Sequence, residues 1–263
     1  MNSDSRENHQ MFQIERQNNI LEYINSAHKA TTNELAEKFN VSKVTIRRDI
    51  DALAEQGLIS KTHGGAVALT NGSLHEIPYS LKSEHNQSAK KKIGKTAAGL
   101  IEDGDIIILD SGSTTLEIAK NITQKNITVV TNDIKIAMEL SGKPNIKLMV
   151  CGGTLINPVY TLTGLATIDF FSNLHVNKTF LGCDAMDLEF GISNRTYEEV
   201  NIKRAMMKAG DINIMCADDS KLDKKVFCYL SGFEVLDILI INRIDERYKK
   251  MFEDKNVKVI LTD

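Results

Sequence analysis

VSKVTIRRDIDAL, residues 41–53, carries two adjacent arginines, Arg47 and Arg48, on a stretch whose apolar residues recur at helical spacing. The formal net charge of the chain is −3, so bulk charge does not draw it to a polyanion such as DNA. We expect a helix that begins after Ser42, whose hydroxyl can cap the first turn, and that stops at Gly57. The two arginines therefore need an explanation in the local geometry of this helix.

The two faces of this predicted helix differ in character. At about 100° per residue, the stripe that faces a core is formed by Ile46, Ile50 and Leu53. The opposite face of the N-terminal half is formed by Val44, Thr45, Arg47 and Arg48. Arginine can pair with guanine or grip a phosphate, and a valine or threonine methyl can contact a thymine methyl. This face is therefore suited to the major groove of DNA.

The flanking segments complete a winged helix-turn-helix pattern. Residues 14–27 have the spacing of an amphipathic helix, and Thr31 with Glu34 has the form of a capping box that begins a second short helix. After the arginine-bearing helix, LISKTHGGAVAL (58–69) indicates two short strands around a glycine bend, a wing suited to the DNA backbone. The predicted DNA-contacting residues are Ser42, Lys43, Val44, Thr45, Arg47, Arg48, Lys61 and His63.

A simpler interpretation is that Arg47 and Arg48 belong to a solvated helix face, as paired charges on surface helices usually do. The order of two helices, a tight turn, a third helix and a wing argues against it. Asp49 and Asp51 dilute the basic patch, which predicts modest non-specific affinity. Specific contacts would then supply much of the binding.

The run ELAEKFNVSKVTIRRDIDALAEQGLISKTHGGA (34–66) resembles the N-terminal signature of the DeoR family of bacterial transcriptional regulators. The match spans the whole predicted N-terminal domain. The resemblance implies that Arg47 and Arg48 lie on the recognition helix of a DNA-binding domain.

Composition is typical of a cytoplasmic protein with two domains. The chain has 263 residues, 42% of them hydrophobic, which is enough for two cores. It has no apolar run of membrane-spanning length, and its polar beginning lacks the order of a signal peptide. Its four cysteines are widely spaced and lack metal-ligand partners, so we expect them to be reduced, and we predict no metal and no cofactor.

We divide the chain into a winged helix-turn-helix domain (1–70), a polar linker (71–88) and an α/β domain (89–263). In the last of these, β-like runs alternate with helical patterns, which indicates an open, mainly parallel sheet. The predicted strands are 105–110, 127–132, 146–153, 178–184, 212–218, 236–242 and 257–261. The predicted helices are 90–102, 114–122, 133–141 and 196–209.

Three polar clusters follow predicted strands, at the sheet edge where such folds bind ligands. The first is a glycine turn into a helix, a potential phosphate cradle, formed by Asp110, Ser111, Gly112, Ser113, Thr114 and Thr115. Thr114 and Glu117 also fit a capping box that needs no ligand. The second cluster contains Asp184, and the third contains Asp218, Ser220 and Lys221. Together they predict a site for a small polar anion, although acid–base chemistry is also open to such residues.

The C-terminal region is similar to the sensor domain of the DeoR family, which is related in fold to ribose-5-phosphate isomerase and binds phosphorylated sugars. The likeness implies that residues 110–115 hold the phosphate. It also places Asp184, Glu198 and Lys221 among polar pocket groups, with Lys203 facing the same pocket. The isomerases carry a lysine and a glycine run between their aspartate and glutamate motifs. The corresponding interval here, AMDLEFGISNRTYE (185–198), holds no lysine, which argues against catalysis.

The sequence therefore favours a DNA-binding repressor of a sugar-metabolism operon that a phosphorylated sugar releases from its operator. We expect no enzyme activity, no membrane partner, and a homo-oligomer, either dimer or tetramer, that matches a two-fold operator. One alternative is a sugar-phosphate isomerase or transferase with an appended DNA-binding module. A chromatin-like binder without a ligand is disfavoured by the net charge and by the polar clusters.

Overall fold

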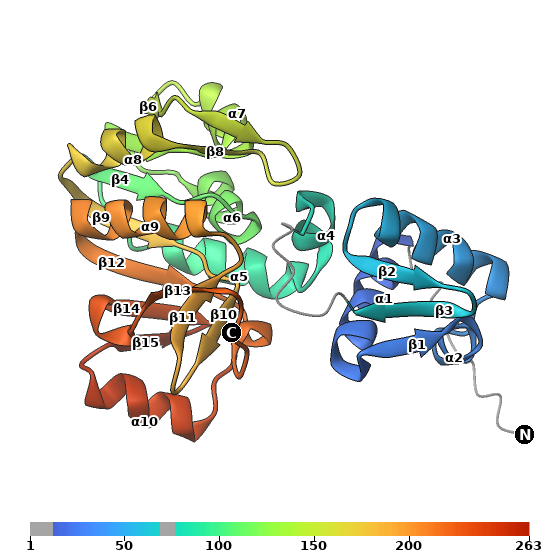
Figure 1. The fold of residues 1–263 in the computed structure, drawn as a ribbon. Coiled ribbons are helices and arrows are strands. Elements are labelled where there is room, and N and C mark those ends of the chain that lie inside the picture. Colours follow the sequence, from blue (N-terminus) through green and yellow to red (C-terminus); the bar gives the residue numbers. More distant parts are fainter. Residues whose placement is uncertain (1–12, 69–76, 263) are drawn as a thin grey trace, which may run out of the picture. The chain divides into compact units, whose positions relative to one another are not determined.

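The computed structural model describes residues 13–68 and 77–262, which divide between two compact units, Met1–Asn71 and Gly72–Asp263 (Figure 1). Each unit has its own hydrophobic core. Within the described residues, no helix combines the length and the apolar character needed to cross a membrane.

The N-terminal unit is a winged helix-turn-helix, as predicted. Its helices are α1 (Gln13–Ala27), α2 (Thr32–Lys38) and α3 (Lys43–Glu55). Its antiparallel sheet, in the order β1-β3-β2, consists of β1 (Lys29–Thr31), β2 (Ile59–Thr62) and β3 (Gly65–Ala68). The β2–β3 hairpin is the predicted wing. The short strand β1, which the sequence did not indicate, joins the wing to the helices.

Local capping fixes where α2 and α3 begin. Thr31 Oγ1 accepts a hydrogen bond from the Glu34 amide (3.2 Å), and the Glu34 carboxylate accepts one from the Thr31 amide (2.7 Å), so the predicted capping box is confirmed. Ser42 Oγ accepts from the Thr45 amide (3.1 Å) at the start of α3. Gly57 follows α3 with a φ of 67°, a left-handed conformation that favours glycine and ends the helix.

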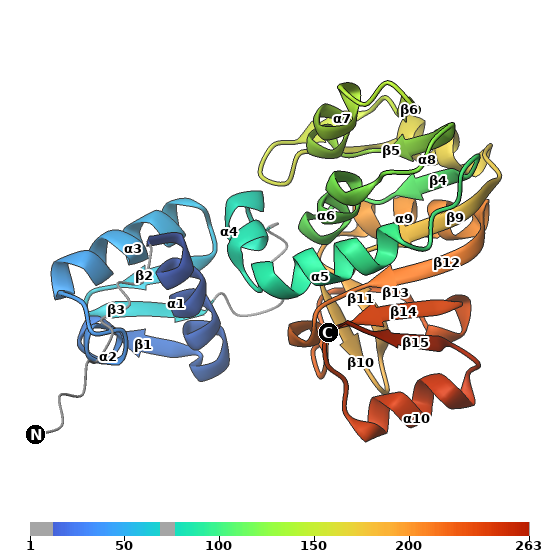
Figure 2. The same cartoon turned by 180° about the vertical axis from the view of Figure 1, so that it is seen from behind.

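The C-terminal unit is built on a seven-stranded parallel sheet in the order β15-β14-β12-β9-β4-β5-β6 (Figures 1 and 2). All seven predicted strands are confirmed. They are β4 (Ile106–Leu109), β5 (Ile127–Thr131), β6 (Ile146–Val150), β9 (Val176–Leu181), β12 (Gly210–Cys216), β14 (Ile238–Ile241) and β15 (Lys258–Leu261).

Helices cover both faces of this sheet, so its strands are apolar on both sides (Figures 1 and 2). One face is covered by α5 (Gln87–Ala98), α6 (Ser113–Asn121) and α7 (Ile134–Ser141). The other is covered by α8 (Leu165–Ser172), α9 (Tyr197–Ala209) and α10 (Glu246–Asp254). The predicted helices correspond to α5, α6, α7 and α9, whereas α8 and α10 were not predicted.

Two small antiparallel sheets extend from the ends of the large one. The first pairs β7 (Thr154–Ile156) with β8 (Thr161–Thr163). The second has the order β10-β11-β13 and contains β10 (Ala185–Asp187), β11 (Gly191–Asn194) and β13 (Cys228–Ser231). Short 3-10 turns, η1 (Asp219–Lys221) and η2 (Phe233–Val235), follow β12 and β13. All four cysteines are free thiols.

The predicted linker, residues 71–88, requires a correction. Residues 71–76 lie outside the described part of the chain, but the second half of the segment is structured. It contains helix α4 (Tyr79–Glu84) and the first turn of α5. Leu81 is buried in the C-terminal unit, and the Tyr79 amide donates to the Pro158 carbonyl (2.7 Å). The polar composition of the segment hid these few anchoring contacts.

Candidate functional site

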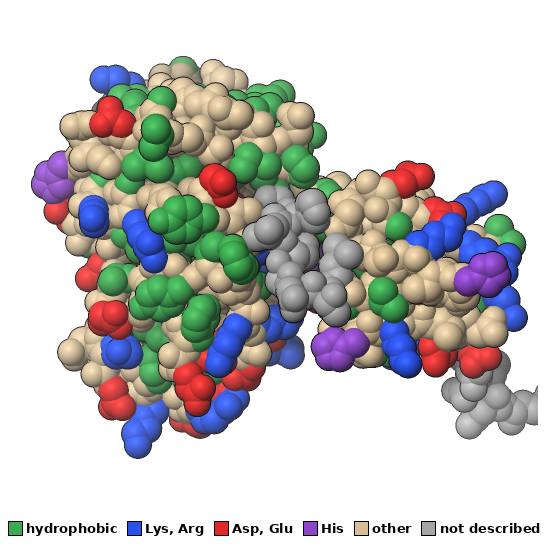
Figure 3. All heavy atoms as spheres, in the orientation of Figure 1, with side chains coloured by type: hydrophobic (Ala, Val, Ile, Leu, Met, Phe, Trp, Pro, Cys, Tyr) green, Lys and Arg blue, Asp and Glu red, His purple; other side chains and the backbone are tan. Residues whose placement is uncertain are grey.

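The outward face of α3 has the exposure that the sequence predicts. Ile46, Ile50 and Leu53 are buried, whereas Val44 is 55% exposed. The remaining exposed residues of this face are Ser42, Lys43, Arg47 and Arg48, with Thr45 partly buried among them. Figure 3 shows Lys and Arg side chains gathered on the part of this unit that contains α3. The arrangement presents two guanidinium groups on one helix turn, as reading a groove requires.

Asp49 does not dilute this basic face, contrary to the expectation from the sequence. Its side chain points inward and is 1% exposed. Arg16 Nε donates to Asp49 Oδ2 (2.6 Å), and Gln17 Nε2 donates to Asp49 Oδ1 (3.2 Å). The wheel places residue 49 beside the apolar stripe, and a cation on α1 makes burial of its charge tolerable. The ion pair thus fastens the recognition helix to α1.

The wing carries the other two predicted DNA contacts. Lys61 lies on β2 and forms an exposed ion pair with Asp51 of α3. His63 is exposed at the bend of the hairpin. An exposed pair of this kind is weak, so Lys61 can exchange Asp51 for a phosphate at little cost.

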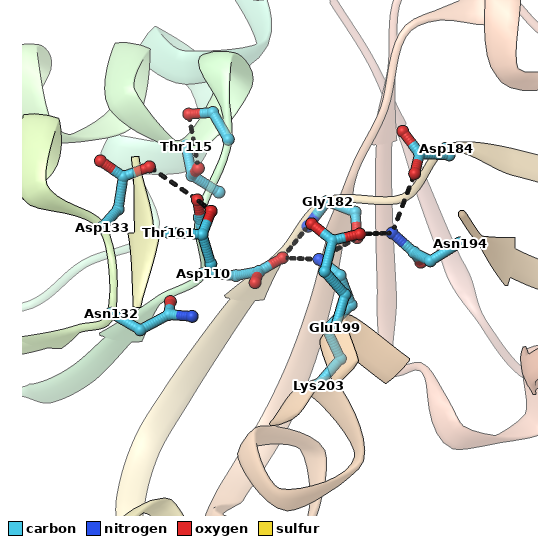
Figure 4. A network of polar contacts seen from close by, with 12 residues as sticks. Asp110, Thr115, Asn132, Asp133, Thr161, Gly182, Asp184, Asn194, Glu199 and Lys203 are labelled. Carbon is cyan, nitrogen blue, oxygen red and sulfur yellow. Dashed lines mark hydrogen bonds and ion pairs between the residues drawn. The ribbon is translucent and has the colours of Figure 1, made fainter. Parts of the chain in front are cut away.

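The predicted effector residues gather at one edge of the large sheet. Four neighbouring strands, β12, β9, β4 and β5, are parallel, and their carboxyl ends meet there. Polar side chains follow each of these strands, namely Asp218, Asp184, Asp110 and Asp133. Figure 4 shows two groups of polar side chains at this edge, one beside α6 and one beside α9.

Asp110 and Lys203 form a buried ion pair at the centre of this edge. Asp110 is 2% exposed and Lys203 is 3% exposed. Asp110 Oδ2 also accepts from the Gly182 amide (2.9 Å), and Lys203 Nζ donates to the Gly182 carbonyl (3.0 Å). Burial opposes the charge of Lys203, but the carboxylates of Asp110 and Glu199 outweigh it and raise the pKa of the ammonium. The pair joins β4, β9 and α9.

The glycine turn after β4 leads directly into α6. Gly112 is the residue before the helix and no side chain caps it, so the capping box of Thr114 and Glu117 is not formed. Ser111 Oγ donates to Asp133 (2.8 Å), and Thr115 Oγ1 donates to the Gly112 carbonyl (3.0 Å). Amide groups at the start of α6 therefore remain available to an anion.

Asp184 lies among cations. Lys82 of α4 forms an ion pair with it (3.3 Å), and the Arg195 amide donates to its Oδ2 (3.2 Å). Burial acts to raise the pKa of Asp184, but the charges of Lys82, Arg195 and Lys221 prevail and hold it well below its usual range. Asp184 is thus a carboxylate, an acceptor suited to ligand hydroxyl groups.

Glu198 requires a correction. It is exposed on α9, whereas its neighbour Glu199 is 7% exposed and lies within hydrogen-bonding reach of the Asn194 amide (3.5 Å; Figure 4). Successive residues on a helix are rotated by about 100°, so Glu198 points away from the face on which Glu199 is buried. Glu199 is the glutamate of this edge.

Two lysines that sequence reasoning missed reach the same edge from the predicted linker and from α5. Lys82 meets Asp184, and Lys90 is 4% exposed. Burial and the charge of nearby Lys221 lower the pKa of Lys90 to about 8. Lys82 lies in the segment predicted as a linker, and Lys90 lies at the start of the predicted helix 90–102, where nothing in the pattern marked it as a site residue.

Lys221, in η1, supplies a third cation. It lowers the pKa values of Asp184 and Asp218 and that of Lys90, so its charge lies close to all three. Within the described chain, no carboxylate oxygen is within ion-pair distance of its ammonium group. Lys221 is therefore a partly exposed cation that is accessible to a ligand.

Several buried polar atoms at this edge have no hydrogen-bond partner among the described residues. They are Asn132 Oδ1, Asn194 Oδ1, Arg195 Nε and Asp218 Oδ2. Buried polar groups are almost always paired with protein or with ordered water, so unpaired ones at the ends of these strands make this edge a candidate binding site. Asn132 follows β5 and was also missed, although the strand-end rule that found Asp110 applies equally to it.

These features define a class of protein, a winged helix-turn-helix DNA-binding domain joined to an α/β ligand-binding domain. The profile of the DeoR-like helix-turn-helix domain matches residues 16–71, and that of the DeoR C terminal sensor domain matches residues 85–243. The chain belongs to the DeoR family of helix-turn-helix transcriptional regulators.

Curated relatives agree along nearly the whole chain. The uncharacterized HTH-type transcriptional regulator YulB of Bacillus subtilis is 35% identical over 95% of this chain and 96% of its own. The glycerol-3-phosphate regulon repressor of Escherichia coli is 31% identical over 86% of this chain and 90% of its own.

Among solved structures, ribose 5-phosphate isomerase from Plasmodium falciparum overlaps partially. It is 17% identical, with a TM-score of 0.38 over 51% of this chain and 52% of that chain. The seven-stranded sheet and its helices, rather than this overlap, define the fold.

Proposed function

We propose that this regulator represses a sugar-metabolism operon and that a phosphorylated sugar releases it from the operator. The observation that carries the proposal is the gathering of three lysines at the start of α6 and beside Asp184. Lys82 contacts Asp184 (3.3 Å), and its backbone carbonyl accepts from Ser113 of α6 (3.3 Å) and from Lys90. The charge of Lys221 acts on both Asp184 and Lys90. A helix N-terminus and ammonium groups favour an anion. Carboxylates and amides beyond them favour hydroxyl groups. A sugar phosphate has an anionic group at one end and hydroxyl groups at the other.

The effector residues proposed from the sequence fit this division of roles. Ser113 and the amides of residues 113–115 would meet the phosphate, and Lys221 would offset its charge. Asp184 would accept from sugar hydroxyl groups, while Asp110 and Lys203, already paired, would hold the edges of β4, β9 and α9 in register. Glu199 takes the place first given to Glu198. The name of the Escherichia coli relative, a glycerol-3-phosphate regulon repressor, supports both repression and a phosphate ester.

We also propose that the protein binds the sugar phosphate without converting it. The cation nearest the centre of the edge, Lys203, is held by Asp110 and the Gly182 carbonyl, so it is poorly placed to shuttle a proton. A coupled isomerase assay with the full chain should give no activity above the buffer rate. Turnover that Lys203→Met abolishes would favour the enzyme alternative.

We also propose that the protein acts as a homo-oligomer in the cytoplasm, where its operator lies. Large hydrophobic side chains are exposed on adjoining elements of the C-terminal unit: Leu165 (85%) on α8, Tyr197 (63%) on α9 and Tyr229 (45%) on β13. Figure 3 shows hydrophobic side chains spread over one face of this unit. Such a surface is typical of an interface, and a dimer would place two recognition helices on two half-sites.

The effector site can be tested with a thermal-shift screen of phosphorylated sugars on wild type, Ser113→Ala and Lys221→Ala. A hit should stabilise wild type and lose most of its effect in Lys221→Ala, because the anion then faces Asp184 and Asp218 without that cation. In operator titrations the hit should weaken DNA binding by about 5–150-fold, and DNA should weaken the hit equally.

Operator affinity without ligand should stay unchanged in Lys221→Ala, which gives a repressor that no longer responds. Equal stabilisation of both variants and wild type would show that the site is misplaced. A hit that binds but leaves operator affinity unchanged would refute the sensor function.

A further inference from the structure

Helix α4 lies across the proposed effector site. The Lys82 ammonium contacts the carboxylate of Asp184 (3.3 Å). The Lys82 backbone carbonyl accepts hydrogen bonds from Ser113 Oγ (3.3 Å) and from the buried ammonium of Lys90. A single residue thus contacts both ends of the site, the start of α6 and the carboxylate after β9.

These contacts resemble those that a sugar phosphate would make. A carbonyl oxygen that accepts from a hydroxyl at a helix N-terminus and from a buried lysine occupies the position of a phosphate oxygen. The ammonium donor on Asp184 occupies the position of a sugar hydroxyl. An effector that uses Ser113, Lys90 and Asp184 must therefore displace Lys82 from all three.

The anchor of α4 lies outside this set of groups. The Tyr79 ring packs edge-on against Tyr160 (centroids 6.1 Å apart), and the Lys135 ammonium lies 4.4 Å from the Tyr79 ring centre. The Tyr79 amide donates to the Pro158 carbonyl (2.7 Å). Together with the burial of Leu81, these cation–π and aromatic contacts hold α4 in place, and a ligand that competes for the Lys82 contacts has to overcome them.

We propose that α4 is an internal ligand of the sensor domain, which occupies the effector site in the DNA-binding state and which the effector expels. The inference rests on the proposed function, since it assigns the regulation of that same site. Within the described chain, α4 is the first helix after the DNA-binding unit. Its release therefore lengthens and loosens the connection between the two domains, which explains why the effector weakens operator binding.

The closing experiment uses the full chain and inorganic phosphate as the probe. Hydrogen exchange is followed at residues 79–85 with and without phosphate, and phosphate affinity is measured by calorimetry. Tyr79→Ala and Lys135→Ala each remove one partner of the contact between the Tyr79 ring and the Lys135 ammonium. Both therefore loosen α4 and leave Ser113, Lys90 and Asp184 unchanged. Lys250→Ala, which removes an exposed lysine from α10, is the matched control.

Phosphate should increase exchange in α4 of wild type. Both α4 variants should bind phosphate about tenfold more tightly than wild type, because α4 no longer competes with phosphate for the site. Without phosphate, their operator affinity should fall by about 5–150-fold, while Lys250→Ala stays at wild-type values for phosphate and for operator.

Two other outcomes overturn the inference in distinguishable ways. In the first, phosphate binds wild type, Ser113→Ala weakens that binding, and phosphate protects α4 from exchange. Helix α4 is then a lid that stays on the ligand, and the proposed function survives without the internal ligand. If phosphate binds neither wild type nor the two α4 variants, both the site and the internal ligand are refuted.

Discussion

Arg47 and Arg48 are adjacent, exposed residues of α3. The ion pair of Arg16 with Asp49 holds this helix against α1, so neither exposed arginine is needed for that. Replacement of Arg47 or Arg48 by Ala should therefore weaken operator binding and leave stability nearly unchanged. The expected loss is about 1–3 kcal/mol where the side chain reads a guanine, and less where it meets only phosphate.

Mobility shifts with operator and with scrambled DNA measure this loss. Arg243→Ala, which removes an exposed arginine from the C-terminal unit, is the control for charge alone. Operator affinity that is the same in wild type and in both α3 variants would refute the assignment of the recognition face.

Lys90 gives the stability of the C-terminal unit a specific pH dependence. Its pKa is lowered from 10.5 to about 8 by burial and by Lys221, so the native state loses this proton near pH 8 while the unfolded chain keeps it to about 10.5. The unfolded state binds more protons in that window, so stability rises with pH. Between pH 7 and 9.5, wild type should gain about 2 kcal/mol relative to Lys90→Met in urea unfolding.

Lys91→Met, at an exposed position on the same helix, should follow wild type in this experiment. A Lys90→Met variant that keeps the same pH slope as wild type would show that Lys90 is not responsible.

Single residues were predictable where a periodic rule fixes their direction. The wheel assigned Val44 and Ile46 to opposite faces, and the strand-end rule found Asp110 and Asp184. Neither rule reaches Lys82, because a six-residue helix in a polar segment has no period long enough to detect. These contacts depend on tertiary structure, which brings residues distant in sequence together.

At the scale of elements, one buried ion pair sets the position of the recognition helix. Asp49 is the only charged residue of α3 that is buried, and Arg16 and Gln17 of α1 satisfy it. Asp49→Asn keeps the shape but leaves the Arg16 charge without its carboxylate, so it should destabilise the N-terminal unit by about 3–5 kcal/mol.

Urea unfolding, followed by a probe in the N-terminal unit, measures this effect. Asp51→Asn breaks the exposed pair with Lys61 instead and should change stability by less than about 1 kcal/mol. Equal effects of the two substitutions would show that burial of the Asp49 pair has no special role.

Elements were predictable in proportion to the clarity of their hydrophobic pattern. The central strands of the large sheet are buried on both faces, and all seven strands form apolar runs that amphipathic helices and loops separate, so all seven were found. Helix α8, LATIDFFS, is too uniformly apolar to show a period, and α10 buries only Tyr248 and Phe252. The short antiparallel strands depend on partners distant in sequence, such as β11 with β13.

At the scale of the whole molecule, the exposed apolar face of the C-terminal unit leads us to expect at least a dimer. Light scattering at micromolar concentration should give a multiple of the 29.3 kDa chain mass. Replacing Leu165 and Tyr197 together by Ser should shift it toward the monomer and weaken operator binding, since one winged domain makes a small interface. A wild-type monomer with full operator affinity would contradict this expectation.

The strand order of the large sheet also governs how each copy is made. Its middle strand, β9, pairs with β4 on one side and with β12 on the other, so β9 lacks one of its two neighbours until residues 210–216 have been synthesised. The N-terminal unit precedes the whole sheet in the chain and leaves the ribosome first, so it can fold before the sheet is complete. Every nascent chain therefore passes through an interval in which it carries a finished DNA-binding domain but has no sensor yet to restrain it.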